Sequence, residues 1–335
     1  MKTVKILGLD DSAATTITGP HDVLSLVGVA SNFLQGKEPE PLFNVEIVTP
    51  GGRPAKCFNG VEVNAHRAME DVDGCDLVIV SALLDIEQTL ERQGNIISWL
   101  RQQYESGAVL ASVCTGSFVL AETGLLDHKI ATTHWGMAEE FRARYPLVDL
   151  KVERLITDSG DILCSGAFNA FIDLSMYVVE KSCGREIAIN TAKALVHDMG
   201  RSLQSPYSVF NFQHEHGDKL ILKIQQRLES EYSRPLSIES LALENGLGKR
   251  TLERRFKAAT GDSPLLYLQR VRVEAAKHRL EQGGQTFSEI SYAVGYDDPG
   301  FFRKLFKKFT GLRPSEYREK FTRSPEVPFE ELQGT

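Results

Sequence analysis

Two stretches near the carboxyl end of the chain repeat one residue pattern and decide the fold there: FKAATGDSPLLY at Phe256–Tyr267 and FKKFTGLRPSEY at Phe306–Tyr317. Phe, Lys, Thr, Gly, Pro and Tyr recur between them at an offset of 50 residues. Upstream, LALENGL at Leu241–Leu247 matches ISYAVGY at Ile290–Tyr296 at an offset of 49. A repeat of this length predicts one supersecondary unit that occurs twice.

The pattern within each repeat predicts a helix, a sharp turn and a second helix. Leu252 and Phe256 are one helical turn apart, so both can face Leu241 and Ala242. Gly246 stands between the two apolar segments, where a tight turn needs a positive φ. Each repeat is therefore expected to be a helix-turn-helix unit.

Helix end signals follow the second helix of the first unit. Gly261 is expected to end that helix, and Ser263–Pro264 to begin the next one with a cap residue and a proline at the first helical position. The second copy repeats the pattern with Ile290, Ala293, Gly295, Phe302, Phe306, Gly311 and Pro314.

The second helix of each unit has a basic face around its apolar residues. Between Asp218 and Lys320 there are 20 Lys and Arg against 14 Asp and Glu, a net charge of +6. The whole chain has a net charge of −7, so the residues outside this range have a net charge of −13. A basic module on an acidic protein is typical of phosphate binding. Two amphipathic hairpins with solvated charged faces are the alternative, but the repeated turn residues favour DNA binding.

Three segments make this part of the chain similar to the AraC/XylS-type DNA-binding domain: Arg250–Pro264, Leu268–Leu280 and Glu289–Arg318. The resemblance implies an all-α C-terminal domain in which a long helix joins two helix-turn-helix units. It also implies that two recognition helices enter successive major grooves of double-stranded promoter DNA.

The resemblance also implies which residues contact DNA. By position they are Lys249, Arg250, Glu253, Arg254, Gly300, Arg303, Lys304 and Lys307. Arg can pair bidentately with guanine, and Glu can accept from cytosine. Because Gly300 has no side chain, the second helix is expected to read less sequence and to hold more backbone. Gly248 stands where such turns often place a Ser cap.

The N-terminal part alternates strand-like and helix-like segments. Strands are predicted at Val4–Asp10, Asn44–Pro50, Asp76–Ala82 and Ala108–Val113, and helices at Asp22–Phe33, Glu87–Tyr104 and Arg185–Met199. This order predicts an α/β domain, a parallel sheet with helices on both faces. Ligands of such sheets bind at the carboxyl ends of the strands.

One stretch of this part, ASVCTGSFVLAETGLLD at Ala111–Asp127, predicts a strand that runs into a cysteine and then a helix. The small residues Ser112 and Gly116 flank Cys114 as a nucleophile elbow requires, because a sharp strand-to-helix turn lifts the central side chain above the sheet. A helix N-terminus beside a thiol also lowers its pKa and favours anions.

Together with KIATTHW (Lys129–Trp135) and CSGAFNAFIDL (Cys164–Leu174), this stretch resembles the PfpI/ThiJ domain of the glutamine-amidotransferase-like superfamily. The resemblance covers residues 2–200 and implies an amidotransferase-like fold. More narrowly, the chain is similar to the GlxA-like regulators, which fuse this domain to an AraC-type one.

Catalysis at Cys114 is not expected, and the residue is at most a vestigial nucleophile. A thiolate hydrolase needs a His within reach and an acid to orient it. Thr115 follows the cysteine where enzymatic relatives often have His, and the later loop at Cys164–Ala167 has neither group. The acidic residue that such relatives carry after the first strand is not evident in Ile17–Pro20. His134 is the one nearby candidate.

A small-molecule pocket is expected instead, with Cys114, Thr115, His134 and Ser165 as its lining. A different interpretation leaves His134 and Trp135 packed in the core. The effector of similar regulators is often an amino acid or an amine.

The remaining features predict organisation and location. Five cysteines, an odd number without metal spacing, indicate reduced thiols in a cytoplasmic protein without metal or cofactor. No apolar run approaches 18 residues and no leader is evident, so neither a membrane span nor a signal peptide is expected.

We expect a sensor and dimerisation domain at 1–200, a linker at 201–218, a DNA-binding domain at 219–321 and a disordered tail at 322–335. His214 and His216 are expected to be solvated linker residues rather than metal ligands.

The sequence thus predicts a homodimeric transcription regulator that a small metabolite controls, with RNA polymerase as a candidate partner. Two alternatives stay open. One is a Cys-dependent hydrolase or amidase of the PfpI/ThiJ type that carries a DNA-binding module. The other is a ligand-free DNA-binding protein whose N-terminal domain only dimerises.

Overall fold

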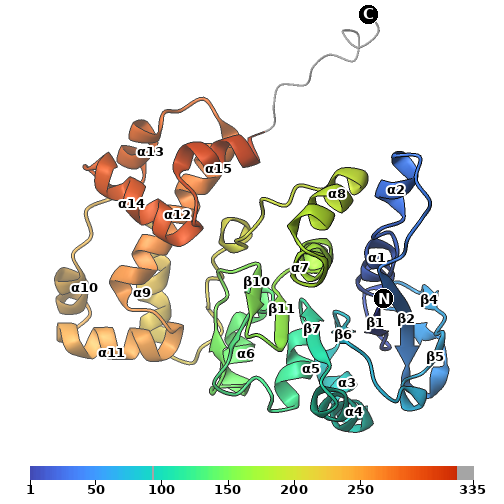
Figure 1. Cartoon of the computed structure of the whole chain (residues 1–335). Coiled ribbons are helices and arrows are strands. Elements are labelled where there is room, and N and C mark those ends of the chain that lie inside the picture. Colours follow the sequence, from blue (N-terminus) through green and yellow to red (C-terminus); the bar gives the residue numbers. More distant parts are fainter. Residues whose placement is uncertain (93, 323–335) are drawn as a thin grey trace, which may run out of the picture. The chain divides into compact units, whose positions relative to one another are not determined.

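The computed structural model describes residues 1–92 and 94–322, which form two compact units (Figure 1). The first is Met1–Gln204 and the second begins at Ser205. The predicted tail at 322–335 lies, except for Thr322, outside the described residues. Among the described residues no helix is both long and apolar enough to cross a membrane.

The first unit is built on a seven-stranded sheet in the order β10-β11-β7-β6-β1-β2-β5. All neighbouring strands are parallel except β10 and β11, which are antiparallel. Two small sheets, β3-β4 and β8-β9, accompany it. The strands are β1 (Lys2–Leu7), β2 (Phe43–Thr49), β3 (Ala55–Lys56), β4 (Glu62–Val63), β5 (Arg67–Ala68), β6 (Leu77–Val80), β7 (Val109–Val113), β8 (Ile130–Ala131), β9 (Asp149–Leu150), β10 (Ile156–Asp158) and β11 (Ile162–Ser165).

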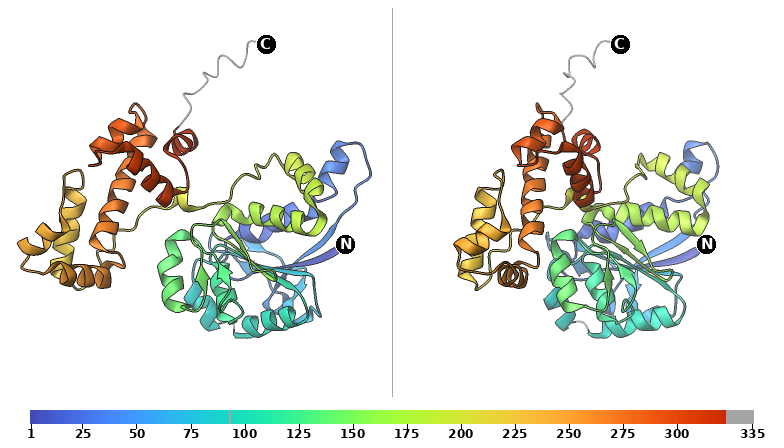
Figure 2. Two further views of the ribbon diagram at one scale, coloured as in Figure 1. Left: turned by 60° about the vertical axis from the view of Figure 1, so that its left-hand side comes forward. Right: turned by 90° about the vertical axis from the view of Figure 1, so that its left-hand side faces the viewer.

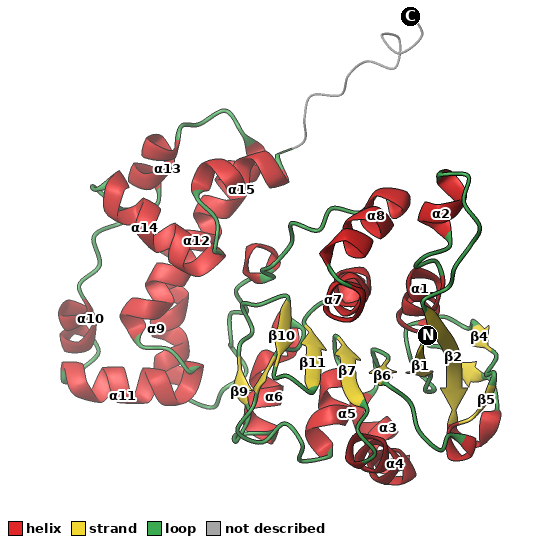
Figure 3. Cartoon of the chain, viewed as in Figure 1, coloured by secondary structure: helices red, strands yellow, loops and turns green. Residues whose placement is uncertain are grey.

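Helices cover both faces of this sheet, which confirms the predicted fold class. The core on one face lies under α1, α7 and α8, and the core on the other under α3 to α6, as Figures 2 and 3 show. All four residues of β6 are buried, as expected of a central parallel strand. The helices are α1 (Ala14–Ser25), α2 (Ala30–Leu34), α3 (Ile86–Arg92), α4 (Gly94–Glu105), α5 (Gly116–Glu122), α6 (Ala138–Arg144), α7 (Phe171–Cys183) and α8 (Arg185–Leu195).

The helix predicted at Asp22–Phe33 is wrong in its bounds, because the chain there forms α1 and α2 with a break at Gly28. Gly28 has φ +76°, and a Cβ at this residue would lie 2.0 Å from the main-chain oxygen of Glu40. That close approach comes from outside the segment, so local periodicity could not reveal it. The helix predicted to end at Met199 likewise ends at Leu195, where Val196 adopts a left-handed conformation with φ +52°.

The second unit is all-α, as predicted. Its cores lie on either side of α12, which gives Tyr267, Leu268 and Val271 to the first and Ala276 and Leu280 to the second. The 19-residue α12 therefore joins the two halves through shared packing. The helices are α9 (Lys219–Ser230), α10 (Ile238–Glu244), α11 (Lys249–Thr260), α12 (Pro264–Gln282), α13 (Phe287–Ala293), α14 (Pro299–Thr310) and α15 (Pro314–Phe321).

Residues 205–216, which we call the strap, lie within the predicted linker but pack against the second unit. The Phe210 ring lies 5.1 Å from that of Tyr267 and the Tyr207 ring 5.3 Å from that of Phe321, between centroids. The strap thus contacts both cores of this unit. Its aromatic content explains the difference from a solvated linker, since half-buried rings remove apolar surface from water.

Candidate nucleic-acid interface

The first helix-turn-helix consists of α10 and α11. Leu241 and Ala242 pack with Leu252 and Phe256 in one buried cluster, as predicted. Gly246 has φ +69°, which confirms the positive φ expected at the turn. No side-chain hydrogen bond caps α11, in agreement with the glycine at its N-cap.

The second unit, α13 and α14, repeats this geometry with stronger capping. Thr286 and Glu289 form a capping box at the start of α13. Asp298 Oδ1 accepts hydrogen bonds from the main-chain N–H groups of Gly300 (2.8 Å) and Phe301 (3.1 Å) at the start of α14. The first turn of α14 is therefore held by a side chain, whereas that of α11 is not.

The outer face of α11 presents two unpaired cations. Arg250 and Arg254 are exposed and form no ion pair with any described residue. Lys249 forms an ion pair with Glu239 of α10. Arg255 is half-buried and donates to both carboxylate oxygens of Asp218, at 2.9 and 2.7 Å, so this basic residue holds α11 against the start of α9.

The remaining predicted DNA contacts lie where the sequence places them, and their contact with DNA stays a prediction. Glu253 is half-buried on α11. Gly300, Arg303, Lys304 and Lys307 are exposed along α14. The Arg303 guanidinium lies 5.6 Å from the centroid of the Phe287 ring.

Sequence reasoning missed Phe301, which is half exposed on the same helix as these residues. The FF pair at Phe301–Phe302 was the available signal, because adjacent residues of a helix point about 100° apart and one of the two can face outward.

The first unit contains the predicted elbow at Cys114, where β7 runs into α5. Cys114 has φ +53°, which confirms a sharp turn with a non-glycine residue in the left-handed region. A Cβ at Gly116 would lie 2.6 Å from the main-chain oxygen of Ser81, so the small residue expected there is required.

The hydroxyls around this elbow are used within the fold. Thr115 Oγ1 donates to the main-chain oxygen of Leu83 (2.6 Å) and accepts from its N–H (2.9 Å). Ser165 Oγ donates to the oxygen of Ser112 (3.2 Å) and is fully buried. These bonds tie neighbouring segments together and use the donor hydrogen of each hydroxyl.

The surroundings of the Cys114 thiol favour its protonated form. Burial raises the pKa of Cys114 to about 11, against a smaller opposing effect of hydrogen bonds from Thr115. Burial also lowers the pKa of His134, whose Nδ1 accepts from the N–H of Gly136 at 3.1 Å. In the neutral ring this bond places the proton on Nε2 and occupies the lone pair of Nδ1. The ligand site predicted at Cys114, Thr115, His134 and Ser165 stays a prediction.

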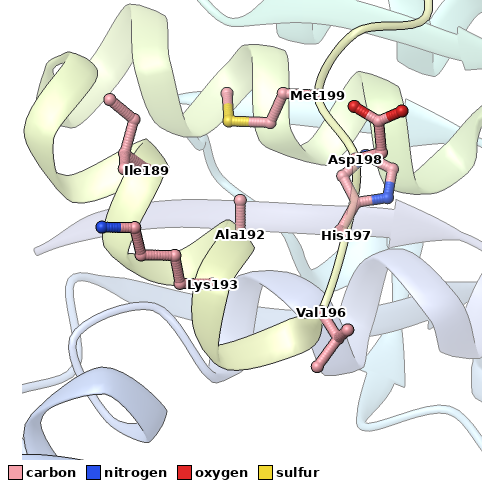
Figure 4. Close-up of a pocket in the computed structure, with 7 residues that line it drawn as sticks. All are labelled: Ile189, Ala192, Lys193, Val196, His197, Asp198 and Met199. Carbon is pink, nitrogen blue, oxygen red and sulfur yellow. The ribbon is translucent and has the colours of Figure 1, made fainter.

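An open and largely apolar pocket lies elsewhere in this unit, against the end of α8 (Figure 4). The sequence had no signal for it beyond an Ala-rich helix. The pocket is lined by Ile189, Ala192, Lys193, Val196, His197, Asp198 and Met199.

No group of His, Cys, Asp and Glu within the described part of the chain could hold a metal ion.

Two family models match the chain. That of the DJ-1/PfpI family covers residues 13–181, half of the 335 residues, and that of a helix-turn-helix domain covers residues 241–320. The crystal structure of Drosophila melanogaster DJ-1beta is similar with a TM-score of 0.51 at 18% identity, over 59% of this chain and 98% of that chain. This likeness concerns the fold.

Curated relatives match along both units. The HTH-type transcriptional regulator CdhR of Pseudomonas aeruginosa is 27% identical over 285 residues, which cover 83% of this chain and 82% of CdhR. The HTH-type transcriptional regulator GlxA of Rhizobium meliloti is 25% identical over 294 residues, 87% of this chain and 89% of GlxA. With its DJ-1/PfpI-like sheet and its duplicated helix-turn-helix, the chain therefore belongs to the DJ-1/PfpI family as a GlxA-like, AraC-type DNA-binding transcriptional regulator.

Proposed function

We propose that this regulator binds promoter DNA through α11 and α14 and that a small metabolite bound to its first unit controls the binding. The observation that carries the proposal is the duplicated recognition helix with an exposed basic face. Arg250 and Arg254 on the first copy and Lys304 and Lys307 on the second are exposed and have no carboxylate partner among the described residues. Cations without internal partners are available for phosphate oxygens and base edges.

The roles within the interface follow from side-chain chemistry. Arg250 and Arg254 pair with guanine, Glu253 accepts from cytosine, and Arg303 and Lys304 contact bases on the second copy. Lys249 and Lys307 hold the phosphate backbone, and Gly300 lets the second helix lie close to the DNA. Lys249 exchanges its pairing with Glu239 for a phosphate contact.

The first unit acts as a sensor rather than an enzyme in this proposal. A neutral thiol with a pKa of about 11 is a poor nucleophile near neutral pH, and the Nδ1 atom of His134 is already bonded to the Gly136 N–H. The effector, for example an amino acid or an amine, binds at the carboxyl ends of the strands near Cys114, Thr115, His134 and Ser165.

The assembly is a cytoplasmic homodimer that recruits RNA polymerase when it activates. Two linked DNA-binding units raise the effective concentration of the second at its site. The metabolite changes the population of arrangements that can bind both sites.

The test is binding of the full chain to the DNA upstream of its own coding sequence, titrated against salt with and without a metabolite panel. We expect tight, salt-steep binding that one metabolite shifts. Binding that no metabolite shifts would support the ligand-free alternative.

A second test addresses the hydrolase alternative. Cys114→Ser is expected to keep DNA binding and the metabolite response, since a slightly smaller hydroxyl replaces the thiol. Turnover of an amide or ester substrate by the wild type, lost in this variant, would contradict the proposal.

A further inference from the structure

Phe301 is a large apolar side chain on the otherwise charged outer face of α14. It is 50% exposed, whereas Phe302 and Phe306 on the same helix are fully buried. Exposed charged residues lie before it at Asp297 and Asp298 and after it at Arg303 and Lys304. A single exposed aromatic ring is common on protein surfaces, so its position on the recognition helix has to carry the argument.

Phe301 stands in the first turn of α14 and in one row with two exposed lysines, of which Lys304 is a predicted DNA contact. Lys304 and Lys308 follow it by three and seven residues, the spacing of one helical face. In helix-turn-helix proteins the N-terminal residues of the recognition helix contact base edges. The hydrogen bonds from the Gly300 and Phe301 N–H groups to Asp298 hold this turn in place.

The ring is supported from one side and open on the other. The Tyr296 ring lies 5.9 Å from that of Phe301 and stacks on the buried Phe302 ring at 4.5 Å, between centroids. The Arg272 guanidinium lies 4.8 Å from the Tyr296 ring. Phe301 is thus placed by a built aromatic stack and is not a loose surface side chain.

The neighbouring Gly300 allows a close approach to DNA. It carries no side chain, and it is exposed at the start of the helix. A longer side chain there would hold the helix away from the base edges. Its absence would let the next residue, Phe301, approach the bases of a bound duplex.

We propose that Phe301 reads the C5-methyl group of a thymine in the major groove. Thymine is the base pair member that presents a methyl group there, and Phe is among the apolar side chains that contact it. The same position of the first copy is Thr251, also exposed, whose side chain ends in a methyl group. This inference rests on the proposed DNA binding by α14 and gives the second copy a sequence preference of its own.

The experiment selects duplex sites from a random library with the full-length protein and then replaces each thymine of the selected site by deoxyuridine. Removing one contacted methyl group is expected to lower wild-type affinity about fourfold at one position. Phe301→Ala is expected to bind more weakly and to show no loss at that position. A cytosine placed there is expected to bind more tightly once it is 5-methylated.

Two further variants separate base reading from stability. Phe301→Leu keeps an apolar side chain and is expected to keep part of the thymine preference. Leu265→Ala removes another exposed apolar side chain, 56% exposed on α12, and is expected to keep the full deoxyuridine loss. Circular dichroism checks the folding of each variant.

The inference is overturned if wild-type affinity is unchanged by deoxyuridine at every thymine, or if Phe301→Ala keeps the wild-type loss. Both results need only a selected site. A wild-type protein that enriches no sequence would instead overturn the proposed DNA binding itself, which is a distinct outcome.

Discussion

Arg254 and Arg255 are neighbours on α11 with opposite surroundings. Arg254 is exposed and unpaired within the described part of the chain, whereas Arg255 is half-buried and bonded to Asp218. Composition counts both as cations of a basic face, but only an arginine without an internal partner can pair with DNA at no cost to the fold.

Arg254→Ala is therefore expected to lose about 1–3 kcal/mol of specific binding and to relax one base position. Lys307→Ala, the matched control, is expected to weaken binding to all sequences and to reduce the salt slope by about one. Fluorescence anisotropy on selected and scrambled duplexes measures both. Equal effects of the two variants on every duplex would contradict the assignment of base and phosphate roles.

Asp218→Asn tests the structural role of Arg255. Burial raises the pKa of the Asp218 carboxyl, but the hydrogen bonds and charge of Arg255 and main-chain N–H groups outweigh it and lower that pKa. A carboxyl with a lowered folded pKa stabilises the protein above its unfolded value near 3.9 and loses this contribution as pH falls through the folded value.

The variant should thus be less stable than the wild type at pH 7 by roughly 0.5–1 kcal/mol, and the difference should shrink as pH falls from about 5 toward 3. Asn still caps α9, since the cap bond from Ile221 N–H needs only the side-chain oxygen. Hydrogen exchange over α9 and α11 gives the local stability. A difference independent of pH would show that the ion pair contributes nothing.

The two helix-turn-helix units have turns of the same backbone conformation, but the atoms around the two turns differ. Gly246 and Gly295 both have positive φ, +69° and +90°. No atom lies within 4 Å of a Cβ built at Gly246, whereas one at Gly295 would lie 2.7 Å from the main-chain oxygen of Ser233. The repeat therefore explains the backbone conformation, and the packing of Gly295 is additional.

Gly246→Ala is expected to cost about 1 kcal/mol, since only backbone strain opposes it. Gly295→Ala should cost roughly 2–4 kcal/mol, because the backbone around Ser233 must also move. Hydrogen exchange over residues 236–261 and 286–311 measures each unit separately. Equal losses would mean that the close approach at Gly295 relaxes freely.

Packing against α12 and the strap holds the second unit together. The strap rings pack on Tyr267 and Phe321, and Lys277, buried on α12, donates to the main-chain oxygen of Ser208. A chain that starts at Ser205 keeps these contacts, and a chain that starts at Gly217 loses them but keeps Asp218.

The shorter fragment is expected to be less stable by roughly 2–4 kcal/mol, the free energy of exposing two or three half-buried rings. Thermal unfolding of both fragments by circular dichroism makes the comparison. Identical unfolding temperatures would show that the strap adds no stability and acts only as a linker.

Much of this architecture follows from local signals. The glycines at the turns and the Ser263–Pro264 helix start act within a few residues and are where expected, and strands and helices alternate as predicted, apart from the helix bounds corrected above. The elbow at Cys114 belongs to the same class, since small flanking residues are a requirement of one turn.

Other features depend on partners distant in sequence. The helix breaks at Gly28, where the main chain of Glu40 lies against the glycine. Thr115 forms its hydrogen bonds with Leu83, and Arg255 is paired with Asp218. The open pocket on α8 and the half exposure of Phe301 are likewise properties of packed surfaces.

The sequence alone was therefore enough to determine the two folds, the duplicated helix-turn-helix and the basic face, because turn chemistry, periodicity and charge are local. Which cations are free, which hydroxyls are already bonded and which aromatic ring faces outward was decided by the folded chain. Those properties arise when segments tens of residues apart compete for the same polar groups and the same apolar surface.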